Sequence, residues 1–445
     1  MPSDTPLQFA RRLNDLANVQ WSLGSRSQLV KHHPELHGQP QQLWHGFVQY
    51  EAALASAMEA VGSYRQLPSA FLPDLASSLS NLGIWQGDLG QHEAALVSTQ
   101  EAVDICRQLV RGSAGAFLPN LAESLLNLSN AQRDMDQLDI AQRSNQEAVT
   151  IYRKLADDDP KKYTRGLAGS LSGLAAKQGM LGQHDAALLS SQEAVHLQRR
   201  LVKGHPNAFL PELASSLTNL GISQDAIGQG EVALQTTQEA VRIRRQLAKD
   251  EPDAFLPDLA QSLNSLGIRH INLDQHEEAV KSSQESVDLY RRLAEGRPGA
   301  FLDALVGGLN NLGSDQSILG RNDAALKSLQ EATLICRQHV FLPKLATSLS
   351  NLGNVQSRLG LREEALCSTI EATATFRQLA KDQPAMYLPG LARSLGCLSQ
   401  RYIEMGRKKA ALAAAKECVR IFETLARSNP YFRVDLVLGR ILQLC

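Results

Sequence analysis

Asparagine recurs at one position in five of eight similar segments of the chain. A primary amide carries both a donor and an acceptor, so a row of amides can pair with peptide N–H and C=O groups whatever the side chains of that peptide are. Gly173, Ser265 and Cys397 interrupt the row. The alternative is that these asparagines only cap or bridge neighbouring segments. The residues expected to bind a peptide or protein partner are Asn81, Asn127, Asn219, Asn311 and Asn351 of the row, together with Asn354 and Arg358.

Histidine is the second group that could do chemistry. Four of the eleven histidines lie in one stretch, at His32, His33, His37 and His45. Zinc or nickel binding is conceivable, but Pro34 disturbs the facing geometry of His33 and His37, and no cysteine accompanies them. We therefore expect a solvated loop and no metal.

Catalytic motifs are missing from the sequence. It contains no phosphate loop of the Gly-x-x-x-x-Gly-Lys-Ser/Thr kind, no His-Glu-x-x-His and no Gly-x-Ser-x-Gly. The pair His45-Gly46 resembles part of a protease site, but no strand precedes it and no nucleophile can be placed beside it. We expect no catalytic residue and no cofactor.

The elements that position the asparagines come from a repeat of 46 residues. A fixed period of this size indicates stacked supersecondary units that present a long surface. One interval, from Phe301 to Phe341, is 40 residues, so we expect the second helix of that unit to end early. The copies open at Phe71, Phe117, Tyr163, Phe209, Phe255, Phe301, Phe341 and Tyr387.

Each copy reads as two helices. Leu72, Leu75, Leu79 and Leu82 recur at helical spacing, Pro73 suits a first helical turn, and Gly90 can take the left-handed conformation that ends a helix. A second apolar stripe follows over residues 95–109, and pairs such as Asp159-Pro160 break it. The sequence therefore predicts an all-α chain of helical hairpins.

Three further rows of residues follow the same period. Small residues such as Gly83, Ala95 and Ala102 predict close helix packing. The glutamine row that starts at Gln86 predicts hydrogen bonds between packed helices. A glutamate row and an arginine row predict ion pairs between adjacent repeats, with a solvated edge as the alternative.

These patterns resemble the tetratricopeptide repeat, TPR, over nearly the whole chain. Leucine stands where the usual tryptophan would be, as at Leu79, and glutamine mostly replaces the usual tyrosine. The long period is similar to arrays of the kinesin-light-chain type and to those attached to signalling NTPases and CHAT proteases. The resemblance implies a right-handed superhelix, or α-solenoid, of about nine hairpins plus a C-terminal helix. It also implies that the asparagine row lines the concave groove.

The expected organisation has three parts. Residues 1–67 form a first hairpin split by an inserted loop at 25–50, and residues 71–426 form eight tandem hairpins. Residues 430–445 form a capping helix or half of a further repeat, and the array either ends there or continues beyond the chain end.

The amino-acid composition restricts the classes of partner that the chain is expected to bind. The net charge is -1, with 45 basic and 46 acidic residues in no block, so nucleic acid and anionic membranes are poor candidates. The six cysteines lack metal-ligand spacing and are expected to be buried free thiols, in line with a cytoplasmic location.

The sequence favours a non-catalytic scaffold that binds a peptide segment or protein in its concave groove. One alternative is a regulatory or sensor arm that controls a separate NTPase or CHAT-type protease. Another is a structural scaffold that self-associates through its C-terminal helix.

Overall fold

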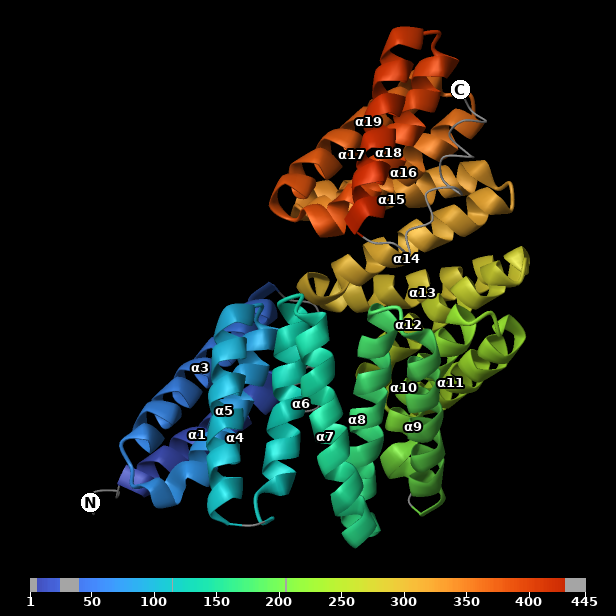
Figure 1. Cartoon of the computed structure of the whole chain (residues 1–445). Coiled ribbons are helices and arrows are strands. Elements are labelled where there is room, and N and C mark those ends of the chain that lie inside the picture. The colour runs from blue at the N-terminus through green and yellow to red at the C-terminus, as the bar shows by residue number, and fades with distance from the viewer. Residues whose placement is uncertain (1–5, 25–39, 114, 205, 429–445) are drawn as a thin grey trace. The chain divides into compact units, whose positions relative to one another are not determined.

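The computed structural model describes residues 6–24, 40–113, 115–204 and 206–428. These residues form eighteen α-helices, one short 3-10 helix and no strand (Figure 1). The all-α fold predicted from the repeat is therefore confirmed for the described part of the chain. The handedness of the superhelix stays a prediction.

The chain divides into two units between residues 262 and 263, inside α12 (Pro252–Asn272), and each unit is described by itself. The first unit also contains α1 (Pro6–Gly24), α3 (Pro40–Arg65), η2 (Ser69–Phe71), α4 (Leu72–Asp88), α5 (His92–Gly112), α6 (Leu118–Asp134), α7 (Leu138–Asp158), α8 (Pro160–Met180), α9 (His184–Gly204), α10 (Pro206–Ala226) and α11 (Gly230–Asp250). The second also contains α13 (His276–Gly296), α14 (Pro298–Ile318), α15 (Asn322–His339), α16 (Leu342–Arg358), α17 (Arg362–Asp382), α18 (Pro384–Glu404) and α19 (Lys408–Ser428).

Consecutive helices pair as hairpins, as the apolar stripes predict. Figure 1 shows α4 to α9 side by side, and each of these helices packs on the next one along the chain. Between α4 and α5, Gly90 takes φ of 76°, a left-handed conformation that glycine adopts at no steric cost. Asp136 and Asp274 take the same left-handed conformation at the equivalent turns, with φ of 59° and 56°.

Several first helices begin earlier than the sequence suggests. The Pro residues of the connecting pairs, such as Pro206 and Pro252, start the next helix rather than only ending the previous one. Proline fits the first helical position because its fixed φ suits the helix and its missing N–H has no partner there anyway. The later prolines Pro211, Pro257 and Pro389, expected in a first turn, consequently lie inside helices.

Part of the segment expected as an inserted loop at residues 25–50 is helical. Helix α3 begins at Pro40, so residues 40–50 are helical rather than part of a loop over 25–50. Residues 25–39 lie outside the described residues, as does the C-terminal helix expected at 430–445.

Buried leucines at a fixed repeat position form the centre of each hairpin. Leu79, Leu125 and Leu217 are at most 1% exposed, and the small residues Ala95 and Ala102 are at most 2% exposed. At Gly83, a Cβ atom would lie 2.4 Å from Thr99 Cγ2, so a larger residue here would require the Thr99 side chain to move. The predicted role of small residues in close packing is therefore confirmed.

The thiols fit the prediction only in part. Cys106, Cys336 and Cys418 are buried free cysteines, whereas Cys367 is exposed and Cys397 is partly exposed. Among the described helices, none combines the length and apolar character needed to cross a bilayer.

The short repeat shortens α15, as predicted. This helix has 18 residues, against 21 in α13, and Val340 follows it in the left-handed conformation with φ of 57°. The Val340 N–H donates to the carbonyl oxygen of Cys336, which closes the helix end. A β-branched residue is poorly suited to this conformation.

We expect Val340→Gly to raise the free energy of unfolding by about 1 kcal/mol, because glycine removes the steric cost of the left-handed backbone. Val340 is 71% exposed, so little packing is lost. Urea denaturation followed by circular dichroism measures the change. The control Val97→Gly, at a 66% exposed site within α5, should lower stability by about 1 kcal/mol. Equal losses in both variants would contradict the expectation.

Candidate partner-binding face

Within each unit the hairpins build two layers. First helices contact the first helices of adjacent hairpins, as α4 does α6 and as α14 does α16. The second helices of adjacent hairpins are joined by long side chains that reach from one helix to the next. In the first unit we call the surface of α4, α6, α8 and α10 its first-helix face, and in the second unit we call the surface of α14, α16 and α18 its first-helix face.

Ion pairs connect the second helices, which confirms the predicted pairing between adjacent repeats. Arg107 Nη2 lies 2.8 Å from Glu147 Oε2, and Arg199 Nη2 lies 2.8 Å from Glu239 Oε2. The side chains are 31% to 53% exposed in these two pairs, so each pair contributes well under 1 kcal/mol. The same arrangement occurs in Arg65–Glu101, Arg153–Glu193, Arg291–Glu331, Arg337–Glu371 and Arg377–Glu417.

The glutamine row joins the two helices of one hairpin. Ser98 Oγ donates to Gln86 Oε1 over 2.8 Å, both groups being buried. The serine always follows its glutamine by twelve residues, and the bond recurs in Ser144–Gln132, Ser190–Gln178, Ser328–Gln316 and Ser368–Gln356. The prediction of hydrogen bonds between packed helices is confirmed for these repeats.

The asparagine row lies on the first helices, and each of its side chains is half-buried. Two members bridge neighbouring first helices: Asn81 Nδ2 reaches Asn18 Oδ1 at 3.5 Å, and Asn311 Nδ2 donates to Asn264 Oδ1 at 3.2 Å. Asn127, Asn219 and Asn351 make no side-chain hydrogen bond to any other described residue. The last three therefore keep their full capacity to bind a partner.

The two remaining candidates take part in contacts between first helices. Arg358 Nη1 donates to the carbonyl and hydroxyl oxygens of Ser317, both at 2.8 Å, and so ties α16 to α14. Asn354 hydrogen-bonds the Cys397 thiol of α18, which offsets part of the rise in the thiol pKa that burial causes. Both residues have a structural role besides any role in binding.

A buried lysine on the same face was not among the expected residues. Lys177 of α8 is 2% exposed, and its Nζ lies 3.2 Å from Asn130 Oδ1 and 3.3 Å from Asn145 Oδ1. Burial, with the nearby Arg133, lowers the pKa of Lys177 to about 8. The sequence feature that could have identified Lys177 is its position four residues after Gly173, where the asparagine row is interrupted.

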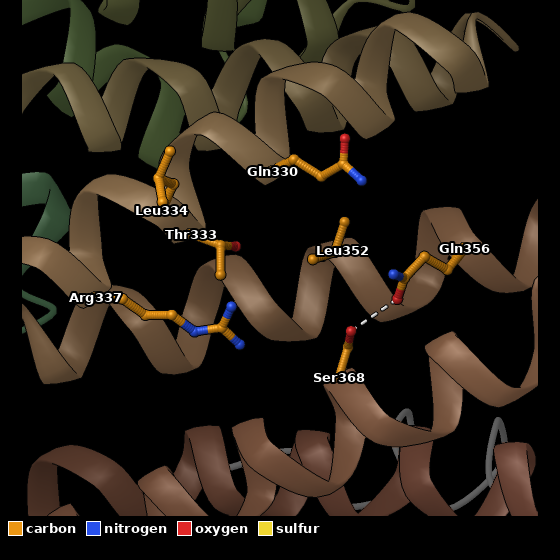
Figure 2. A pocket seen from close by; sticks show the side chains of 7 residues that line it. All are labelled: Gln330, Thr333, Leu334, Arg337, Leu352, Gln356 and Ser368. Carbon is orange, nitrogen blue, oxygen red and sulfur yellow. Dashed lines mark hydrogen bonds between the residues drawn. The ribbon is translucent and has the colours of Figure 1, made fainter.

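Two open pockets lie on the second-helix side rather than on the first-helix face. One of about 330 Å3 is lined by residues of α15, α16 and α17, with the Ser368–Gln356 hydrogen bond on its wall (Figure 2). Another, of about 640 Å3, lies between α5 and α7 and is lined partly by Val97 and Ile140. Both are grooves between successive second helices, a consequence of the spacing that the arginine–glutamate pairs span.

The histidine cluster falls where no side chain is described. His32, His33 and His37 lie outside the described residues, and of His45 only the helical backbone is described. In the part of the chain that the structure describes, no group of three or more His, Cys, Asp or Glu side chains is placed to hold a metal ion.

Comparison with known families identifies four of the hairpins. A family model described as Tetratricopeptide repeat matches residues 75–110, 121–160, 259–295 and 391–426, and each match covers one first helix with its second helix. These four hairpins match the tetratricopeptide repeat. A model described as Anaphase-promoting complex subunit 5 matches residues 207–252 and 308–358 of the TPR array. No curated protein sequence matches this chain.

Solved structures share the fold of the TPR array. A Rap protein complexed with Competence and Sporulation Factor is 12% identical, with a TM-score of 0.51, over 94% of this chain and 99% of that chain. A STAND protein (Signal Transduction ATPase with Numerous Domains) with a tetratricopeptide repeat sensor, from Pyrococcus horikoshii, is 11% identical, with a TM-score of 0.52, over 90% of this chain and 56% of that chain. TPR-like repeats of a putative kinesin light chain from Podosopora anserina are 18% identical, with a TM-score of 0.39, over 50% of this chain and 97% of that chain. The first two similarities show that the chain has the fold of a TPR array, as predicted, and they establish the fold alone.

Proposed function

We propose that this TPR array is a non-catalytic scaffold that binds an extended peptide or a protein partner on the first-helix face of either unit. The observation that carries the proposal is the set of half-buried amides of Asn127, Asn219 and Asn351, which have no hydrogen-bond partner among the described residues. Such amides can pair with the backbone of an extended segment. The Rap protein of the same fold, which was solved with a bound factor, supports the proposal.

The second-helix side is the weaker candidate. Its two pockets are open grooves, and their walls are already occupied by the arginine–glutamate pairs and the serine–glutamine bonds. A partner there would compete with contacts that the array makes with itself. The first-helix face offers unpaired groups instead.

Selection from a displayed library of random peptides, with the full chain as bait, tests the proposal. We expect enriched peptides to bind in solution by fluorescence anisotropy. The triple variant Asn127→Ala, Asn219→Ala, Asn351→Ala should weaken that binding by about tenfold or more, because each lost peptide hydrogen bond costs roughly 1 kcal/mol.

A matched control removes three amides from the second helices, with Gln146, Gln192 and Gln330 each changed to Ala. These side chains are exposed, so the control should bind the selected peptides as the wild type does. Equal affinity of the asparagine variant and the wild type, or the absence of any selected peptide, would refute the proposal.

A regulatory role is the second candidate. The STAND protein that shares this fold carries a tetratricopeptide repeat sensor, so this array could serve as the sensor arm of a separate effector enzyme. An NTPase or CHAT-type protease that co-purifies with the array, and whose activity changes when the array is added, would favour this role. Self-association through residues 430–445 is a further proposal, and light scattering with and without these residues tests it.

A further inference from the structure

In the first unit, the side of a first helix that faces the preceding hairpin is buried. In α6, Leu121, Ser124 and Leu128 are 5%, 4% and 3% exposed. Helix α5 of the preceding hairpin packs on α6, and Cys106 Sγ of α5 lies 3.6 Å from Ser124 Oγ. The residues at the same three positions of α8 and α10 are at most 8% exposed. They are Leu167, Ser170, Leu174, Leu213, Ser216 and Leu220.

Helix α1 carries different residues on the equivalent side. Its register follows from the hydrogen bonds between neighbouring first helices. Ser78 Oγ of α4 donates to Asn14 Oδ1 of α1 at 3.1 Å, and one hairpin later Ser124 Oγ of α6 lies 3.1 Å from Ser80 Oγ of α4. Asn14 therefore corresponds to Ser80. The residues of α1 at the three positions are Phe9, Arg12 and Leu16.

This side of α1 is open to solvent. Phe9 and Leu16 are 44% and 47% exposed, and Val19, one turn beyond Leu16, is 51% exposed. An outer surface of a repeat array that stays in water is usually polar. Large apolar side chains exposed together are instead typical of an interaction site. We call the surface formed by Phe9, Arg12, Asp15, Leu16 and Val19 the outer side of α1.

Another hairpin does not fit on the outer side of α1 as it fits on the first helices that follow. Those helices hold a serine at the position of Arg12, and each serine is at most 4% exposed. A small residue there lets the second helix of the preceding hairpin approach closely, whereas an arginine holds such a helix away. The serines are Ser78, Ser124, Ser170, Ser216 and Ser262.

The charges of the second helices also oppose stacking of two chains head to tail. Glu59 occupies in α3 the position that Glu101 occupies in α5, where it pairs with Arg65 of the preceding hairpin. In α19 the arginine of this ladder is replaced by Glu423, which follows Arg377 by 46 residues. Helix α19 of a second copy stacked on the first hairpin would therefore bring Glu423 towards Glu59, and like charges repel.

Two copies of α1 are instead complementary to each other. Phe9, Arg12, Leu16 and Val19 follow one another at helical spacing and form a single stripe. When two such helices pack antiparallel, Phe9 lies opposite Val19 of the second copy, and Arg12 lies opposite Leu16. Asp15 is exposed beside Leu16, where the long arginine side chain of the second copy can reach it. Two-fold symmetry makes each of these contacts twice.

We propose that the outer side of α1 joins two copies of this chain in an antiparallel, two-fold symmetric dimer, separate from any contact of residues 430–445. The apolar side chains supply the affinity, and the reciprocal pairs of Arg12 with Asp15 fix the orientation. One helix from each copy buries less area than a standard interface, so we expect a dissociation constant on the order of 10 μM. The dimer carries two copies of each first-helix face, so a partner with two binding segments gains avidity.

Sedimentation velocity of the full chain between about 1 and about 200 μM tests this interface. The wild type should shift from monomer to dimer over this range. Leu16→Asp should stay monomeric, because it places a charge in the apolar stripe. The matched control Leu189→Asp, at a 67% exposed site of α9, should dimerise as the wild type does. Circular dichroism checks that both variants fold.

Charge reversal tests the orientation of the two helices. Arg12→Asp and Asp15→Arg should each weaken dimerisation by about tenfold or more, because like charges replace both reciprocal pairs. The double variant should dimerise again, and an equimolar mixture of the two single variants should form a heterodimer. A residue that only supports the fold of α1 would not be rescued in this way.

Three results would overturn the proposal. One is a wild-type chain that stays monomeric over the whole concentration range. The second is a dimer that survives Leu16→Asp, which would place the contact elsewhere on the chain. The third is a double charge variant in which the two losses add, because Arg12 and Asp15 would then not face each other across the interface.

Discussion

Lys177→Met should raise the free energy of unfolding at pH 7 by about 2 kcal/mol. The pKa of Lys177 falls from 10.5 to about 8 in the folded chain, which corresponds to a cost of about 3 kcal/mol for burying the ammonium. Methionine fills a similar volume without a charge. The amide oxygens of Asn130 and Asn145 then lack this donor, which lowers the expected gain in stability by about 1 kcal/mol.

The advantage of methionine should depend on pH in a defined direction. Below pH 8 the lysine is protonated in both the folded and the unfolded chain, so the full cost of its burial is present. Between pH 8 and pH 10.5 the folded chain loses this proton first, so the unfolded state binds more protons and wild-type stability rises with pH. Above pH 10.5 both states are neutral and the cost is gone.

Urea denaturation of the wild type and the variant at pH 7 and near pH 10 measures the two differences. The difference in the free energy of unfolding between the variant and the wild type should be large at the lower pH and small at the higher one. Lys203→Met, at an exposed site of α9, is the matched control and should show no such pH dependence. A methionine variant that is less stable than the wild type at both pH values would show that Lys177 is not an uncompensated buried charge.

Leu217→Ala should lower the free energy of unfolding of its hairpin by about 3 to 4 kcal/mol, because it removes a fully buried side chain and leaves a cavity. Leu217 is 0% exposed and packs in a cluster with Val195, Leu213 and Leu220. Stability in such arrays is the sum of repeat and nearest-neighbour terms, so the loss should be local.

Hydrogen exchange measured along the chain tests both the size and the place of this effect. Protection should fall in α10, α11 and the adjoining α9, while α4 and α5 keep theirs. Leu189→Ala, at a 67% exposed site of α9, should change stability by less than about 0.5 kcal/mol. Loss of protection spread evenly over the first unit would contradict the local picture.

The fold could be predicted from sequence because its signals are local. The leucine stripe, the glycine turn at Gly90 and the fixed period all act within one repeat or between copies of it, and the helices follow them. Even the early end of α15 follows from six missing residues. The first residues of the helices were harder to predict, because one proline both ends a helix and begins the next. Sequence alone does not say which of two nearby prolines begins the helix.

The candidate face could be predicted only in part. The asparagine row is visible as one repeated residue type, but the bond between Asn311 and Asn264 depends on the spacing of two first helices. Lys177 was not predicted because the other repeats carry unlike residues at this position, such as Trp85 and Ala131. No single copy therefore marks it as special. Its meaning emerges only when Gly173 is considered together with the burial of the ammonium.

The serine–glutamine bonds also bear on the mechanics of the array. Each such bond closes a single hairpin across twelve residues, and neighbouring hairpins are joined by helix packing, as α9 is to α10, and by solvent-exposed ion pairs between second helices. A chain tethered at both ends and put under tension would therefore meet similar resistance within a hairpin and between hairpins, so no hairpin would come away as an intact unit.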